Sequence, residues 1–219
     1  MDFKETLITN KRIIAVFLTV IIAFSLFMYW IYAQQPFRSE WTSQYMSGAT
    51  EVQATFYDPS GDEVSGVEVK KLAWVTTGDR VVATVKWSVD LHISYKDLVS
   101  PLTVNVTLVY PTTTEGESAK QTKTLTIPIK VHSASIIRRV EFDLINLPKV
   151  TVEPPMIPKT YRLKYEIYVN LTAPTIYGDT ASASDAIALT ASLVWKQAWV
   201  EVKIVPSGAE QLAIFTYET

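Results

Sequence analysis

From residue 50 onward, the chain alternates apolar and polar positions with a period of two. The pattern is clearest over residues 81–90, 102–110 and 161–172. Such alternation is typical of strands that bury one face in a core and expose the other to water. Weaker stretches of the same kind predict strands over residues 50–57, 66–76, 122–132, 138–145, 188–196, 199–205 and 212–217. About ten short strands separated by turn signals favour an all-β fold, an immunoglobulin-like antiparallel β-sandwich.

Interruptions of the alternation predict local details of this sandwich. Pro128 cannot donate a backbone hydrogen bond, so its strand is expected at a sheet edge. The four prolines of residues 148–158 predict a segment that crosses from one sheet to the other. The apolar phase slips after Trp195, which predicts a bulge near residues 197–198. Residues 182–191 are the best candidate for a helix in this region, although they also fit a loop that leads into a strand.

The N-terminal segment follows a different pattern, because residues 13–33 are almost wholly apolar. At about 1.5 Å per residue, a helix of this length spans ~31 Å, which matches the apolar core of a bilayer. The sequence therefore predicts one N-terminal transmembrane helix. Its anchor positions are Ile13, Phe17, Ile21, Phe24, Phe27 and Trp30, and its small residues Ala15, Thr19 and Ala23 form a face for helix packing.

Charges at the two ends of this segment predict its orientation. Lys4, Lys11 and Arg12 precede the helix, whereas only Arg38 closely follows it. The positive-inside bias places the N-terminus in the cytoplasm and the β domain outside the cell membrane. A cleaved signal peptide is the alternative, but its apolar region is usually shorter than this one. The expected organisation is a tail over 1–12, the helix over 13–33, a connector over 34–49 and the sandwich over 50–219.

Composition narrows the functional classes. The net charge is −2 and no basic stripe is present, so we expect no nucleic-acid partner. Cysteine is absent, which excludes disulfides, thiolate metal ligands and cysteine nucleophiles. No nucleophile elbow or phosphate-binding glycine loop occurs, and we expect neither a cofactor nor enzymatic activity.

A few residues are candidates for chemistry. Asn105 and Asn170 each begin an Asn-x-Thr triplet, the N-glycosylation sequon, and each falls on the polar face of its strand. His92 and His132 both fall on solvent-facing positions, which argues against a shared metal or catalytic site. The loop that holds Asp58, Asp62 and Glu63 is better explained as a solvated turn than as a calcium site.

These features favour a membrane-anchored structural or accessory subunit, whose partners are lipid and other membrane or surface subunits in an oligomer or hetero-complex. A subunit of an extracellular filament, pilin-like or archaellum-associated, is one alternative, since the layout is similar to that of archaeal pilins and flagellins and of the archaellum's outer anchoring proteins. Lys11-Arg12 stands where pilins and flagellins carry their processing motif, however. An adhesion or ligand-binding module is another alternative, with Trp41, Tyr45, Tyr110 and Tyr177 as candidate contacts. A metal-free relative of the one-span, one-β-domain oxidase subunits is a fourth reading and merges with the accessory role.

Overall fold

The computed structural model describes residues 15–27, 37–57, 61–64, 70–74, 84–148, 159–196 and 199–206. The chain divides into two compact units, Met1–Gln35 and Pro36–Thr219. The two units are described separately below.

In the first unit, residues 15–27 form a helix. Its large apolar side chains are exposed on every side, including Phe17 at 68% and Phe24 at 62%. The hydroxyl of Thr19 donates a hydrogen bond of 2.9 Å to the carbonyl of Ala15, which satisfies this polar group within the helix. Within residues 15–27 and the rest of the described chain, no helix is long and apolar enough to cross a membrane. Both ends of the predicted span, including Ile13 and Trp30, lie outside the described residues, so the span over 13–33 stays a prediction.

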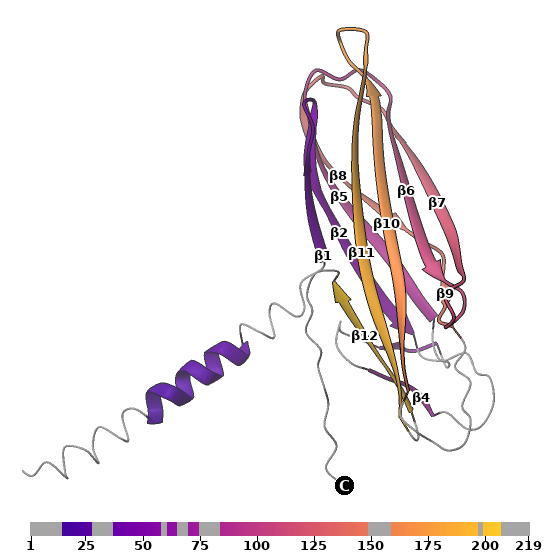
Figure 1. The fold of residues 1–219 in the computed structure, drawn as a ribbon. Helices are drawn as coiled ribbons and strands as arrows, with labels where there is room; N and C mark the ends of the chain where they lie inside the picture. The colour runs from indigo at the N-terminus through magenta and orange to yellow at the C-terminus, as the bar shows by residue number, and fades with distance from the viewer. Residues whose placement is uncertain are drawn as a thin grey trace, which may run out of the picture. The chain divides into compact units, whose positions relative to one another are not determined.

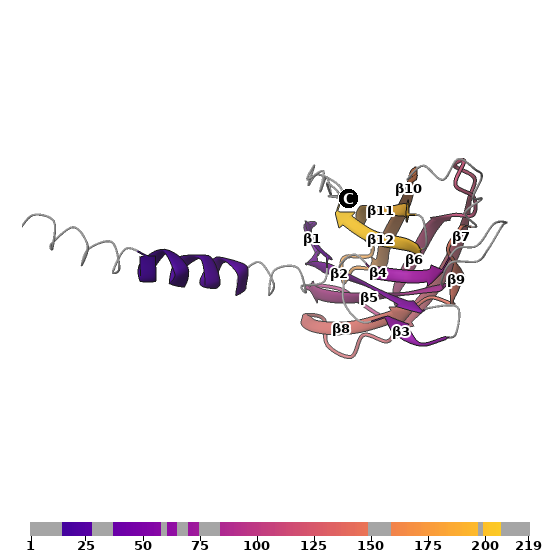
Figure 2. The same cartoon turned by 90° about the horizontal axis from the view of Figure 1, so that it is seen from below.

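The second unit consists of two antiparallel sheets (Figures 1 and 2). Sheet 1 has the strand order β1-β2-β5-β8, with β3 paired to β2 and β9 paired to β5. Its strands are β1 (Phe37–Thr42), β2 (Met46–Tyr57), β3 (Glu63–Val64), β5 (Thr84–Tyr95), β8 (Ala134–Glu141) and β9 (Ile145–Asn146).

Sheet 2 has the strand order β4-β12-β11-β10-β6-β7. Its strands are β4 (Lys70–Trp74), β6 (Leu102–Pro111), β7 (Ser118–Ile127), β10 (Lys159–Pro174), β11 (Thr180–Lys196) and β12 (Trp199–Pro206). The β10–β11 hairpin pairs over the whole of β10, which at about 3.3 Å per residue makes it ~50 Å long. The two antiparallel sheets confirm the all-β class that the alternation predicted.

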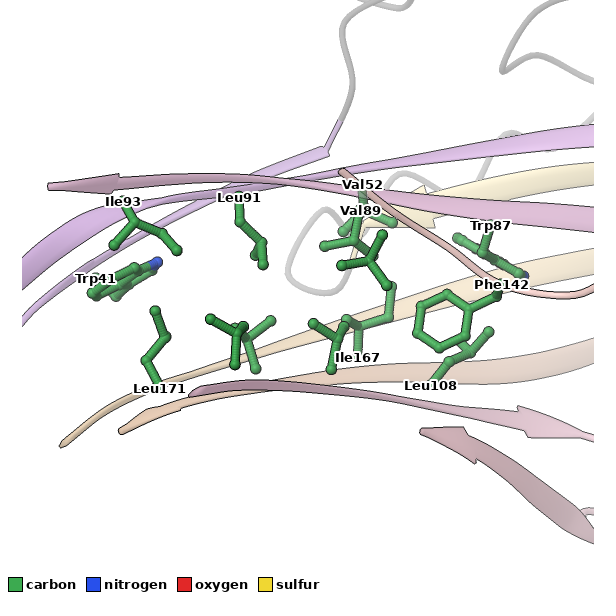
Figure 3. Packing of buried hydrophobic residues seen from close by; sticks show 14 of the residues in the cluster. Trp41, Val52, Trp87, Val89, Leu91, Ile93, Leu108, Phe142, Ile167 and Leu171 are labelled. Atoms are coloured by element: carbon green, nitrogen blue, oxygen red, sulfur yellow. The ribbon is translucent and has the colours of Figure 1, made fainter. Parts of the chain in front are cut away.

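One hydrophobic core lies between the two sheets. Leu91 and Val89 of β5 point toward Leu171 and Ile167 of β10 in the facing sheet (Figure 3). The rings of Trp87 and Tyr165 pack together with centroids 4.9 Å apart. Burial raises the pKa of Tyr165, because the phenolate would lose its hydration. Over the described residues of the three clearest alternating stretches, the core therefore contains the apolar half of the pattern, as the sequence predicted.

The sandwich begins earlier than the sequence pattern indicated, because β1 and the start of β2 lie inside the expected connector over 34–49. Phe37 and Trp41 of β1 face the core, but Ser39 takes the inward position between them and weakens the apolar signal. Trp41 packs over Gly48, where an added Cβ would come within 2.8 Å of the indole and 1.9 Å of the His92 carbonyl oxygen. The expected boundary at residue 50 was therefore wrong. Glycine is required at position 48 because the backbone of β5 and the indole of Trp41 both approach it closely.

Other local predictions had mixed outcomes. Strand β7 is a sheet edge, as Pro128 indicated, and the proline-rich segment connects β9 of sheet 1 to β10 of sheet 2. Residues 182–191 belong to strand β11, so a helix there was wrong. The phase slip arises because Lys196 pairs with Trp199, which makes β11 and β12 a hairpin. The predicted bulge at 197–198 and the predicted strand over 212–217 lie outside the described residues.

A polar contact joins the two sheets at each open side of the sandwich. On one side, the Ser39 hydroxyl of β1 donates to Asp185 of β11 at 2.9 Å. On the other, the ammonium of Lys123 on β7 lies 3.1 Å from the carboxylate of Asp143. Asp185 and Lys123 pair with the core residues Val169 and Val106, so both face inward on their strands. An inward-pointing charge is a known means of protecting a strand that would otherwise present a free edge.

Candidate glycan and interaction sites

The outward side of sheet 2 carries an array of uncharged polar residues, which we call the neutral face. In register across β7, β6, β10 and β11, hydroxyl and amide side chains follow one another in consecutive rows. Its members are Thr103, Asn105, Thr107, Thr122, Thr124, Thr126, Tyr168, Asn170, Thr172, Ser182 and Ser184. Inward residues such as Val104 and Leu171 are fully buried, so the alternation fixes these polar residues outward.

The two sequon asparagines lie next to each other on the neutral face. Asn105 of β6 and Asn170 of β10 are direct cross-strand partners. The Thr124 hydroxyl of edge strand β7 donates to Asn105 Oδ1 at 2.7 Å. The sequence placed each asparagine on a polar face, which is confirmed, but it gave no sign that the two meet or that Thr124 holds one of them.

The outward side of sheet 1, which we call the charged face, is cross-linked by ion pairs. One register row runs Arg38, Glu51, Asp90 and Arg139 across β1, β2, β5 and β8. Arg139 makes two hydrogen bonds to Asp90, at 2.7 and 2.5 Å, and Arg38 Nη1 lies 3.0 Å from Glu51. The guanidinium of Arg139 lowers the pKa of Asp90, because its hydrogen bonds favour the ionised carboxylate.

Four turns meet at one end of the sandwich, at the tip of the β10–β11 hairpin (Figure 1). This loop end consists of residues 43–45, 96–101, 128–133 and 175–179. The turn of residues 96–101 holds the other three together: the backbone of residues 96–99 is hydrogen-bonded to each of them or to the strand end beside it. The bonds are Lys96 N to Tyr45 O at 3.0 Å, Leu98 N to His132 O at 3.1 Å, Val99 N to Pro174 O at 2.8 Å and Ile176 N to Asp97 O at 2.9 Å.

The loop end exposes apolar side chains on this ordered framework. Val131, Ile176 and Tyr177 are 61%, 45% and 69% exposed. Asp97, which accepts from Ile176 N, has a φ of 59°, a conformation that most residues avoid. Desolvation raises the pKa of Tyr45, and the charges of Asp179, Tyr177 and Asp97 raise it further. Backbone strain in an ordered turn is a feature that clusters at functional surfaces.

The four aromatic residues predicted as contacts have different surroundings. Trp41 is buried at 7% exposure, and Tyr45 and Tyr110 are half-buried against the core. Tyr177 alone of the four is largely exposed. The loop-aromatic signal therefore identified one surface residue and three that pack inward.

The histidines and the acidic loop show no metal-binding arrangement among the described residues. His92 lies on the charged face, 3.7 Å from Glu51, and His132 Nδ1 is 2.9 Å from the carbonyl of Leu98. Asp62 and Glu63 are exposed, whereas Asp58 lies outside the described residues. Within the ranges that the structure describes, no group of three or more acidic or histidine side chains has the geometry of a metal site.

A shallow hollow of about 360 Å³ lies beside the β6–β7 turn. Arg162, Lys164, Glu166 and Glu115 line it together with backbone and hydroxyl groups. Lys164 lies 2.5 Å from Glu166, so one of its two cations is already paired. The lining of the hollow thus carries two cations and two carboxylates.

Comparison of the chain with protein-family models, with curated proteins and with solved structures finds no match.

Proposed function

We propose that this chain is a single-pass, non-catalytic accessory subunit that holds its sandwich at the outer face of a membrane. The observation that carries the proposal is the helix of residues 15–27. It bears no charged residue, and its large side chains, such as Phe17 and Phe24, are exposed on all sides. A helix that is apolar all round requires apolar surroundings, which a bilayer or other membrane helices provide. The anchor over 13–33 and its partner face, Ala15, Thr19 and Ala23, belong to this proposal.

The proposal also groups the sandwich with immunoglobulin-like domains, and strand order is its support. The neighbours β2-β5-β8 correspond to strands A, B and E of that fold, and β11-β10-β6-β7 to G, F, C and C′. Strands β1, β12 and β4 extend the two sheets beyond this common set. Immunoglobulin-like sandwiches are frequent in surface proteins, which agrees with an outward position.

A matched pair of substitutions in the helix tests the anchor. I21K places a charge at the middle of the predicted span, which costs about 2.5–3.5 kcal/mol in membrane insertion, whereas I21L keeps the helix apolar. We expect I21L to stay in the membrane pellet after alkaline washing and I21K to lose most of its membrane-bound fraction. Protease added to intact cells should cut the sandwich. An I21K chain that partitions like I21L, or a sandwich protected in intact cells, contradicts the proposal.

A ligand-binding module is the second candidate, and the loop end favours it. Val131, Ile176 and Tyr177 are exposed on turns that backbone hydrogen bonds hold in place. Preorganised aromatic residues bind with a small entropic cost. Y177A should abolish binding to a glycan or peptide array, whereas Y168A, on the neutral face, should leave it unchanged. Equal signals from both variants contradict this second candidate.

A further inference from the structure

The two sequons have the same chemistry but different surroundings. In the sequon of Asn105, both polar side chains are engaged by edge strand β7. Thr124 donates to Asn105 Oδ1 at 2.7 Å, and the hydroxyls of Thr107 and Thr122 are 3.0 Å apart. Asn105 and Thr107 are half-buried on β6, between β7 on one side and β10 on the other. The first sequon therefore contributes to the pairing of β6 with its edge strand.

The second sequon is open. Asn170 and Thr172 are both exposed, and among the described residues neither side chain has a hydrogen-bond partner. Their cross-strand partners on β11 are Ser184 and Ser182, which are small and exposed. A bulky group on Asn170 therefore has free space above β11, whereas a group on Asn105 would stand between β7 and Asn170.

We propose that Asn170 carries an N-linked glycan and that Asn105 stays unmodified, its side chain holding β7 to β6. In the reaction, Asn170 Nδ2 loses a proton and forms a bond to C1 of the first sugar. The bond between that C1 and the phosphate of a lipid-linked oligosaccharide donor breaks, and the lipid phosphate leaves with the electron pair of that bond, its added negative charge balanced by the proton that Nδ2 releases. The Thr172 hydroxyl supplies the hydroxyl that the sequon requires two residues after the asparagine. The inference rests on the proposed function, because this modification occurs on exported segments.

The test is the intact mass of the full-length chain, expressed in a host that glycosylates exported proteins, before and after enzymatic removal of N-glycans. We expect one glycan on the wild type and on N105Q, and none on N170Q. T172S keeps the hydroxyl and should keep the glycan, whereas T172V should lose it. A glycan on N170Q, two glycans on the wild type, or a wild type without any glycan overturns the inference.

A reporter sequon separates this inference from the proposed orientation. Thr112 is exposed in the β6–β7 turn, and T112N creates an Asn-Thr-Thr triplet there. A glycan at the reporter together with a bare Asn170 overturns the inference and leaves the outward orientation intact. If the reporter and Asn170 are both bare, the orientation fails and the inference fails with it. Glycans at both the reporter and Asn170 support both.

Discussion

The charged face of sheet 1 and the neutral face of sheet 2 differ in chemistry, although both arise from the same alternating pattern. The charged face of sheet 1 is occupied by contacts within the chain, such as the two bonds from Arg139 to Asp90. The neutral face of sheet 2 has hydroxyl and amide groups. Two of its members on β10, Asn170 and Thr172, are open to solvent. Alternation thus determines which side chains point outward, but the outward residues decide whether a face is closed by its own bonds or available to a ligand.

The sharpest way to break this comparison is to add one heavy atom to each sheet. G48A places a Cβ within 1.9 Å of the His92 carbonyl oxygen, so sheet 1 must distort, and we expect a loss of about 2–3 kcal/mol in the free energy of unfolding. A186S adds one atom to an exposed position of β11 and should change the free energy by less than ~0.5 kcal/mol. Denaturant titration of the detergent-solubilised full-length chain measures both, and equal losses would remove the contrast.

The bond that holds the edge of sheet 2 should have a medium effect. T124V leaves the Oδ1 atom of Asn105 without its donor, and we expect a loss of about 1 kcal/mol in the same titration. Thr126 is exposed on the same strand and serves as the matched control, because T126V removes a hydroxyl that faces solvent. Identical stabilities for the two variants would show that the Thr124 contact does not stabilise β7.

Added salt should change the coupling energy between paired residues on the charged face but not on the neutral face, and this effect should be smaller than that of T124V. A double-mutant cycle of D90N and R139Q should reveal a stabilising coupling at low ionic strength that falls in ~1 M salt, because ions screen exposed charges. The corresponding cycle of N105A and T124V should not depend on salt, since neither group is charged. A salt-independent coupling between Asp90 and Arg139 would contradict an electrostatic role for this row.

The pH dependence gives the finest comparison. Since Arg139 lowers the pKa of Asp90 in the folded chain, the unfolded chain binds this proton more readily. The stabilisation is therefore complete above the unfolded pKa of about 4 and is lost as the pH falls through the lower folded value. Wild type and D90N should differ near neutral pH and converge in acid. A difference that persists after Asp90 is protonated would assign the effect of D90N to packing.

The sequence predicted the strands and their buried faces because alternation is a local signal. Residues such as Val104, Val106 and Leu171 follow it without interruption and are fully buried. It failed at β1, where Ser39 occupies an inward position to reach Asp185, a partner that is distant in sequence. It also failed in the first half of β11, where alternating alanine and serine lack the bulk that marks a core strand, whereas the strand predicted over 188–196 is confirmed.

Of the candidate sites, the sequence predicted the sequons but not their relation. Register between β6 and β10 sets Asn105 opposite Asn170, and register depends on pairing between segments far apart in the chain. Thr122 and Thr124 carried a weak signal, since they alternate with inward residues on a polar strand. The loop end was missed because its order comes from backbone hydrogen bonds among four turns, which no side-chain pattern indicates.

The inward charges of Lys123 and Asp185 have a consequence for how two copies of the sandwich can associate. When two copies approach edge to edge, the backbone of β7, or of residues 180–188 of β11, comes against another chain. Backbone pairing with a second chain at β7 would require desolvation of the Lys123 ammonium, and pairing at this part of β11 would require desolvation of the Asp185 carboxylate. Continuous backbone pairing between copies at these two edges is therefore disfavoured.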